Sequence, residues 1–243
     1  MDGDDAREGL TRMLRGVPMF ADLPEEVIGQ LVPISRAFSV GRGKVLCVQG
    51  QLPRVLHILL EGQVALTGVA MDGTEAVVDV YHPVSHFVLA AVLTEQAYLM
   101  SAVTILPSRG LEIDAAGLRA LLKREPALSW ALLQSQARDF RQMVRQVRDL
   151  KLRSAAQRLG CYLLALVEDP EANRADLRLP FEKGLLAARL GCRAENLSRA
   201  FAALREHGVE THGAKVSLHD IVRLRAFASP DELPDPRAEW GGS

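Results

Sequence analysis

Three polar side chains near the C-terminus have the types and spacing needed to read DNA bases. Glu195, Ser198 and Arg199 stand at positions i, i+3 and i+4 of the helical pattern 194–206, so they project from one face, opposite the apolar Leu197. Arg can donate two hydrogen bonds to guanine, Glu can accept one from cytosine, and Ser can bond a base or pack near a thymine methyl. The pattern predicts a base-reading helix. The alternative is a helical hairpin of another small domain, with Glu195 and Arg199 as a surface ion pair.

The chain before these residues can position them. A shorter helical pattern, 182–190, comes first, and Gly191 separates it from the second helix. Gly suits such a turn because its backbone takes positive φ at little cost. Two short helices joined by a tight turn, with polar residues at the start of the second, make a helix-turn-helix. We therefore expect a winged helix-turn-helix DNA-binding domain over residues 154–227.

This segment resembles the CRP/FNR superfamily of bacterial transcription regulators. The matching residues are Leu190-Gly191, Glu195, Ser198, Arg199, and Gly208 at the opening of a two-stranded wing. The Glu-x-x-Ser-Arg form is that of the FNR-like branch, so the resemblance implies TTGAT-like half-sites in double-stranded DNA. It also implies a homodimer and contact with RNA polymerase. Arg193 stands where the family usually has a Ser or Thr helix cap, and we expect it to touch a phosphate instead.

The composition is that of a globular protein without a global signal for nucleic acid. The 243 residues, enough for two modest domains, are 48% hydrophobic and 24% charged, with a net charge of −1. A DNA reader must then concentrate its positive charge locally. The sequence shows no apolar run of membrane-helix length and no signal peptide, and its odd, widely spaced cysteines argue against a disulfide framework. We expect a cytoplasmic protein with no membrane association.

The sequence from residue 38 to residue 113 has the pattern of a β-sheet domain. Short apolar runs separated by Gly, Asp and Pro lie at 45–48, 55–60, 63–69, 76–81 and 101–105. Many short strands with regular turns predict an antiparallel barrel or double-sheet roll. The order Gly43–Leu46, Gln49-Gly50 and Leu56–Gly62 resembles the cyclic-nucleotide-binding β-roll, the sensor domain of the same superfamily. We expect an α+β protein with this sensor domain at residues 17–124.

A long helical pattern follows the strands. Leu133, Phe140 and Val147 repeat every seven residues, with Met143 and Leu150 between them. Such a seam predicts a dimerisation helix over residues 125–153. The alternative is a helix packed on its own β-roll, which also needs an apolar stripe. The tail 228–243 is rich in Pro, Asp and Gly, and we expect it to be disordered.

The effector pocket of the roll lacks the charges that a cyclic nucleotide needs. In cyclic-nucleotide-binding members a Glu holds the ribose and an Arg neutralises the phosphate. Leu89-Ala90 and Met100-Ser101 stand at those positions. A buried phosphate without a cation would be costly, so cyclic AMP and cyclic GMP are not expected. We expect Phe87, Ala90, Met100 and Ser101 to line an apolar pocket for a small hydrophobic effector, or for none.

The remaining resemblance concerns a metal cofactor. The first cysteine is Cys47, so we expect no iron–sulfur cluster of the kind that oxygen-sensing FNR proteins hold near the N-terminus. An FNR-like chain with a charge-poor pocket is similar to the nitric-oxide-responsive NnrR/Dnr group, which is associated with haem. The resemblance therefore implies haem as a candidate cofactor, with His57, His82 or His86 as its axial ligand.

Two other classes of protein compete with this interpretation. A cupin-like enzyme could use His82 and His86 as metal ligands, but the His-x-His with a downstream Glu that such sites usually carry is missing. We therefore expect no enzymatic activity. A ligand-binding regulatory subunit without DNA activity would keep the roll, but it would not need Glu195, Ser198 and Arg199 on one helical face.

Overall fold

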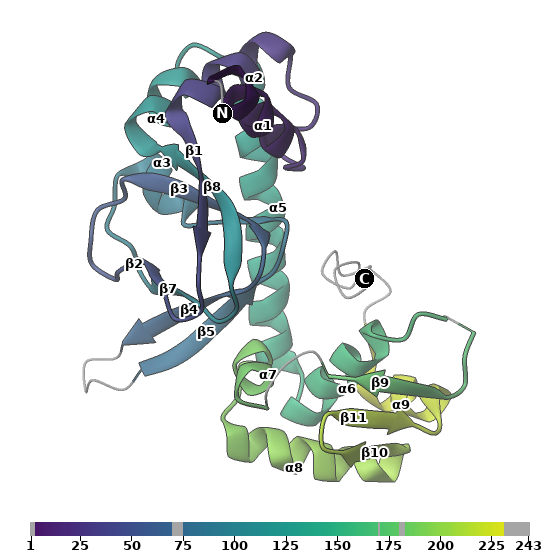
Figure 1. Ribbon diagram of the computed structural model, residues 1–243. Helices are drawn as coiled ribbons and strands as arrows, with labels where there is room; N and C mark the ends of the chain where they lie inside the picture. Colours follow the sequence, from purple (N-terminus) through teal and green to yellow (C-terminus); the bar gives the residue numbers. More distant parts are fainter. Residues whose placement is uncertain (1–2, 70–74, 170, 180–182, 231–243) are drawn as a thin grey trace. The chain divides into compact units, whose positions relative to one another are not determined.

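The computed structural model of the chain describes residues 3–69, 75–169, 171–179 and 183–230 (Figure 1). The chain divides into two units, residues 1–143 and residues 144–243. The first unit holds two four-stranded sheets with helices, and the second holds a three-stranded sheet with helices. The expected α+β fold is confirmed: a β-roll, a long helix and a winged helix-turn-helix follow one another along the chain.

Two antiparallel sheets form the roll, with strand orders β1-β8-β3-β6 and β2-β7-β4-β5. The strands are β1 (Ser35–Val40), β2 (Val45–Cys47), β3 (Val55–Glu61), β4 (Val64–Val69), β5 (Glu75–Tyr81), β6 (Ser85–Phe87), β7 (Ser101–Thr104) and β8 (Ser108–Asp114). The predicted apolar runs coincide with β2, β3, β4, β5 and β7. The strands β1, β6 and β8 have no such run: β1 is largely exposed, β6 has three residues, and polar residues interrupt the apolar ones of β8.

The chain crosses from the first sheet to the second at Gly62, between β3 and β4. The φ of Gly62 is +91°, in the left-handed region that favours glycine. A Cβ atom at this position would lie 2.3 Å from the carbonyl oxygen of Pro107. The closure of the roll at this corner therefore requires glycine on two independent grounds.

Side chains from both sheets fill the interior of the roll. The buried cluster consists of Cys47, Leu59, Val64, Leu66, Phe87, Tyr98 and Ala102. Because all of its members except Tyr98 come from β2, β3, β4, β6 and β7, the two sheets pack directly on each other. An effector entering between the sheets would have to displace some of these side chains.

Helices cover the other side of the first sheet. They are α1 (Gly3–Arg15), α2 (Glu25–Leu31), the 3-10 turn η1 (Val32–Ile34), α3 (Leu89–Thr94), α4 (Ala115–Leu122) and α5 (Pro126–Leu152). One hydrophobic core joins Ile58 of β3 and Leu111 of β8 to all of these helices. From α5 this core takes Leu128 and Leu132, so the first turns of the long helix are part of the roll domain.

The long helix α5 carries a second apolar stripe that its own chain does not cover. Leu133, Phe140 and Val147, the predicted seam, are 58%, 59% and 45% exposed. Trp130, Met143, Val144 and Leu150 are also exposed. The two interpretations of this helix are thus not exclusive, because one face packs on the roll while another stays open.

The second unit contains α6 (Ala155–Ala165), β9 (Ala175–Arg178), α7 (Lys183–Arg189), α8 (Ala194–Leu204), the 3-10 turn η2 (Arg205–His207), β10 (Val209–His212), β11 (Lys215–Leu218) and α9 (Ile221–Ala228). A capping box starts α6, in which Ser154 and Gln157 bond each other's backbone N–H groups. The predicted wing is the hairpin β10–β11, and β9 adds a third strand.

Some predictions fall outside the described residues. They concern residues 231–243 of the predicted tail and residue 182 at the start of the first helical pattern. The division at residues 143 and 144 lies inside α5, whereas the sequence pattern sets residues 125–153 apart as one segment. None of the helices in the described ranges is both long enough and apolar enough to cross a membrane.

Candidate DNA-reading helix and effector region

The turn between α7 and α8 is fixed by glycine and by backbone hydrogen bonds. Gly191 has a φ of +61°, and the N–H of Cys192 donates to the carbonyl of Ala187 over 2.9 Å. A Cβ atom at Gly191 would lie 2.5 Å from a methyl of Leu150, near the end of α5. This glycine therefore allows both the turn and its close approach to α5.

Helix α8 is amphipathic, and its polar face is the predicted one. Leu197, Ala200, Phe201 and Leu204 are buried in the core of the second unit. Glu195, Ser198 and Arg199 are all exposed. The structure brings these three side chains together on one accessible face, where they can meet base edges in a groove.

Asn196 is a residue of this face that the sequence analysis did not single out. The Arg199 guanidinium donates to the Asn196 side-chain oxygen over 2.7 Å. Within the described part of the chain, Arg199 is thus bonded to Asn196, and an ion pair with Glu195 is not formed. The i, i+3 spacing could have indicated this pair.

The N-terminus of α8 lacks a side-chain cap, as the presence of Arg193 at the cap position predicts. Arg193 is the N-cap residue, with an extended backbone, and within the described residues its side chain makes no capping hydrogen bond. Its exposed guanidinium is available to an anion beyond the helix. Glu195 in the first turn interacts favourably with the helix dipole and offsets part of the missing cap.

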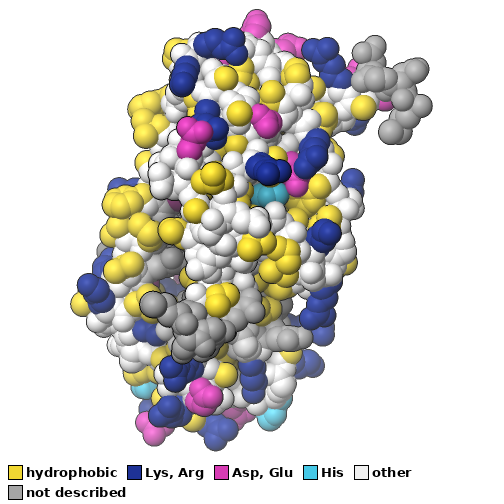
Figure 2. Space-filling model, turned by 90° about the vertical axis from the view of Figure 1, so that its left-hand side faces the viewer, with side chains coloured by type: hydrophobic (Ala, Val, Ile, Leu, Met, Phe, Trp, Pro, Cys, Tyr) yellow, Lys and Arg dark blue, Asp and Glu magenta, His cyan; other side chains and the backbone are white. Residues whose placement is uncertain are grey.

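Positive and negative side chains are mixed on the surface of the molecule. In the face shown in Figure 2, Lys and Arg side chains stand among Asp and Glu, in keeping with a net charge of −1. On the wing, His212 and Lys215 are exposed on either side of the turn at Gly213. These two side chains and Arg193 are suited to phosphate contacts that position α8 without reading sequence.

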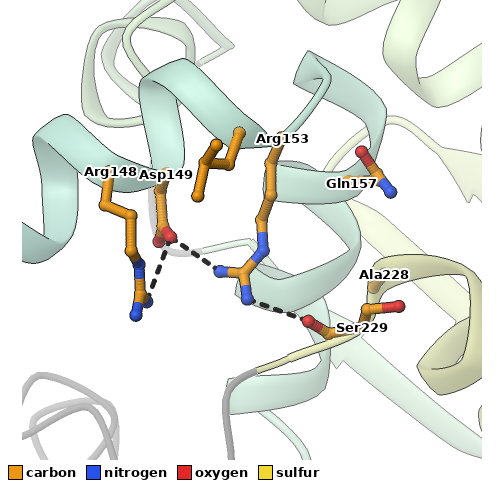
Figure 3. A pocket seen from close by; sticks show the side chains of 7 residues that line it. Arg148, Asp149, Arg153, Gln157, Ala228 and Ser229 are labelled. Atoms are coloured by element: carbon orange, nitrogen blue, oxygen red, sulfur yellow. Dashed lines mark hydrogen bonds and ion pairs between the residues drawn. The ribbon is translucent and has the colours of Figure 1, made fainter.

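A pocket of about 250 Å³ lies within the second unit, where the end of α5 meets α6 and α9 (Figure 3). Arg148 and Arg153 both donate to Asp149, and Arg153 also donates to the carbonyl of Ser229 over 2.8 Å. Both guanidiniums are therefore already engaged with a carboxylate. The arrangement ties the last turn of α5 to α9 and so fixes it on the DNA-binding unit.

The four residues predicted to line the effector pocket do not share one environment. Phe87 is 1% exposed and belongs to the core of the roll. Ala90 is exposed on α3, Met100 is half-buried, and the Ser101 hydroxyl accepts from the Gln49 N–H over 3.0 Å. Pairing of β6 with β3 sets Phe87 opposite His57 and turns its ring inward, which the local pattern does not reveal.

His57 is buried, and the Glu112 carboxylate lies 3.7 Å from its Nδ1, beyond hydrogen-bonding distance. His57 is 1% exposed, its ring stacks on Phe87 with centroids 5.2 Å apart, and neither ring nitrogen is bonded within the described residues. Burial lowers the pKa of His57, and the nearby Glu112 carboxylate only partly opposes this. A neutral imidazole enclosed by aromatic rings is the result.

His86 faces the opposite side of the same sheet. It pairs with Ile58 rather than with His57, so its ring points toward α5, where Nε2 lies 2.8 Å from the Ser135 hydroxyl and 3.6 Å from Asp139. Both partners face the same ring nitrogen, unlike a catalytic Ser-His-Asp arrangement, which uses both nitrogens. Burial lowers the pKa of His86.

The three alternative haem ligands lie in three different environments. His57 is enclosed, the Nε2 of His86 is engaged by Ser135, and His82 lies half-buried before β6. In the described ranges, three metal-binding side chains do not gather at any point. As packed here, neither His57 nor His86 fits an axial ligand of a haem.

Comparison with known families and proteins covers both units. Residues 37–125 match the cyclic nucleotide-binding domain, and residues 157–227 match the Crp-like helix-turn-helix domain. The cyclic AMP receptor protein of Thermus thermophilus is 28% identical over 217 residues, which cover 88% of this chain and 98% of that protein.

Solved structures are similar over nearly the whole chain. A Ruegeria pomeroyi protein described as cyclic nucleotide binding is 30% identical, with a TM-score of 0.60, over 93% of this chain and 100% of that one. FixK2 of Bradyrhizobium japonicum has a TM-score of 0.64 over 83% of this chain and 100% of its own, and at 16% identity this likeness concerns the fold alone.

The buried histidines predict a pH-dependent stability. Burial holds the pKa values of His57 and His86 below their ordinary value of about 6.5, so the unfolded chain takes up protons first as the pH falls. Their neutral forms stabilise the fold fully above about pH 6.5. We expect the free energy of unfolding to fall below that pH, until the folded histidines protonate in turn.

Replacing one of these histidines should flatten the profile. In urea unfolding between pH 7 and pH 5, His57→Leu should reduce the loss of stability on acidification, because Leu cannot take up a proton in either state. Leu99→Ala, which changes an exposed and non-titratable side chain, is the control and should keep the original slope. An unchanged slope in His57→Leu would show that His57 does not titrate differently on folding.

Proposed function

The chain belongs to the CRP/FNR family of transcription regulators, and from this premise we propose that it is a homodimeric reader of TTGAT-like half-sites. The observation that carries the proposal is the exposed face of α8, on which Glu195, Ser198 and Arg199 stand together in a Crp-like helix-turn-helix. The family consists of regulators rather than enzymes. We propose that the protein acts in the cytoplasm and that RNA polymerase is its partner at promoters.

The chemistry of the face matches one G·C pair in such a half-site. Arg199 can donate two hydrogen bonds to the O6 and N7 atoms of guanine, and Glu195 can accept from the N4 amine of a cytosine. Ser198 lies one turn from Ala194 and donates to its carbonyl over 3.2 Å, so its oxygen can still accept a bond or pack near a thymine methyl. Ala202 on the next turn is small and exposed, which lets the helix approach the base edges closely.

Asn196 supports this reading by holding Arg199 before DNA arrives. A long Arg side chain loses rotamer freedom on binding, and the 2.7 Å bond to Asn196 restrains part of that freedom in advance. The Glu-x-x-Ser-Arg form favours the FNR-like branch. The position of the first cysteine at Cys47, buried in the roll, supports a branch member without an iron–sulfur cluster.

The exposed stripe of α5 supports the homodimer. Leu133, Phe140 and Val147 stand seven residues apart and remain open although another face of the helix is buried on the roll. Exposed apolar side chains at heptad spacing are stabilised when a second helix covers them. A two-fold pair of α5 helices would also supply two recognition helices for a palindromic site.

For the effector, we propose an apolar ligand or none rather than a cyclic nucleotide. Two of the similar proteins are described as a cyclic AMP receptor and a cyclic nucleotide binding protein. In this chain, Leu89 is buried, and Ala90 and Met100 supply neither a carboxylate nor a cation. Haem is a further candidate effector, but neither His57 nor His86 can ligate it as packed here, since His57 is enclosed and His86 is bonded to Ser135.

The first prediction from this proposal concerns base reading. Arg199→Ala should weaken binding to a TTGAT-N4-ATCAA duplex by about 1–3 kcal/mol and relax preference at the guanine. Arg199→Lys is the matched variant: it keeps the positive charge but loses the two-pronged donor, so it should lose specificity as well. Titrations against specific and random duplexes measure both effects. Equal losses on the two duplexes would make Arg199 a phosphate contact only.

The second prediction concerns assembly. Phe140→Glu should give monomers in sedimentation, because a charge in the seam must be desolvated beside its two-fold mate. Since Phe140 is 59% exposed in the single chain, the fold should survive. The control Leu99→Glu changes an 83% exposed side chain outside α5 and should leave the dimer intact. A stable dimer of Phe140→Glu would place the interface elsewhere.

The third prediction concerns the effector. Calorimetry with cyclic AMP at millimolar concentration should give no heat, and DNA affinity should not change. Haem-supplemented protein tests the other ligand through its visible spectrum. A Soret band that survives gel filtration would identify haem, and a change of that band in His57→Ala, His82→Ala or His86→Ala would identify the ligand. Heat with cyclic AMP would overturn the proposal for the roll.

A further inference from the structure

An apolar groove lies in the first unit, beside the exposed stripe of α5. Its volume is about 230 Å³, and its lining is Leu93 of α3, Leu122 of α4, and Ser129, Leu132, Leu133 and Gln136 of α5. Leu133 lines the groove and also belongs to the seam proposed for the homodimer. The groove is therefore continuous with that seam.

Trp130 is the largest side chain near this groove that its own chain leaves open. It lies at the start of α5, three residues before Leu133, and is 61% exposed. Ala137 and Val144 follow it at seven-residue intervals and are exposed as well. Trp130 thus begins a second row of the seam, next to the row of Leu133, Phe140 and Val147.

Two-fold symmetry sets this row against the groove of a second copy. When two parallel helices pair, the flank beside one seam row faces the flank beside the other row of the partner helix. Between these flanks, a seam side chain such as Trp130 inserts into a hole formed by four residues of the facing helix, and that hole includes the partner's Ser129 and the partner's Leu133, which both line its groove. We propose that the groove receives the Trp130 side chain of a second copy of this chain, an inference that rests on the proposed homodimer.

The groove has the chemistry that an indole requires. Four leucine side chains supply an apolar wall for the ring. Ser129 is small, and its hydroxyl donates to the Leu122 carbonyl over 2.6 Å, so it is held back against α4. The amide oxygen of Gln136 at the edge can accept from the indole N–H, the bond that buried Trp side chains usually make. Symmetry produces this contact twice in each dimer.

Fluorescence tests the contact directly, because the chain has two Trp residues and the other, Trp240, can be changed to Phe. In the Trp240→Phe protein, Trp130 emission should shift to shorter wavelength, and acrylamide quenching should fall, over the concentrations at which sedimentation detects the dimer. A dimer whose Trp130 stays fully quenchable would overturn the Trp contact and leave the homodimer standing. A protein that is monomeric throughout would overturn both.

Variants test the energetic role. Trp130→Ala should raise the dimer dissociation constant about tenfold or more, as removal of a buried Trp anchor does at other interfaces. Gln136→Ala keeps the helix but removes the indole partner, so it should weaken the dimer less and leave Trp130 shielded from quencher. Leu99→Ala, far from α5 in sequence and 83% exposed, is the control. A Trp130→Ala dimer as tight as the original would contradict the proposal.

Discussion

Helix α5 has two apolar faces, and its own chain buries only one of them. Leu128 and Leu132 enter the core of the first unit, whereas Leu133 and Phe140 stay exposed on the adjoining face. Burial of the first face holds the helix on the roll and so dictates which stripe points outward. At about 25 cal/mol for each Å² of apolar area removed from water, the exposed stripe favours association with another surface.

Helix α5 makes specific contacts both with the roll and with the DNA-binding unit. Its first turns pack on the roll, where Ser135 bonds His86 of β6. Its last turn is tied to α9 by the bonds from Arg153 to Asp149 and Ser229, and Leu150 lies against the turn at Gly191. A change in the roll that moved β6 would therefore act on α5 through a buried polar contact as well as through apolar packing.

The roll keeps the architecture of a nucleotide sensor but fills its interior with its own side chains. Phe87 and Tyr98 pack between the sheets, and His57 is buried as a neutral ring against Phe87. Such an interior is costly to open, because the displaced rings would lose their packing. In the DNA-binding unit, by contrast, the candidate binding residues are exposed: α8 buries its apolar side and leaves Glu195, Asn196 and Arg199 accessible.

The local pattern of apolar and polar residues in the sequence determined the secondary structure and the main exposed faces of this protein. Helical spacing placed Glu195, Ser198 and Arg199 on one face, apolar runs located most strands of the roll, and the seven-residue repeat marked the stripe of α5. These features depend only on the period of a helix or strand, which sequence records directly. Tertiary structure alone decided that Phe87 lies inside the roll and that His57 and His86 face opposite sides of a sheet. It also decided that the groove next to Leu133 takes its walls from three helices. These outcomes depend on which strands pair and which helices meet, and such contacts join residues far apart in the chain, where local periodicity carries no information.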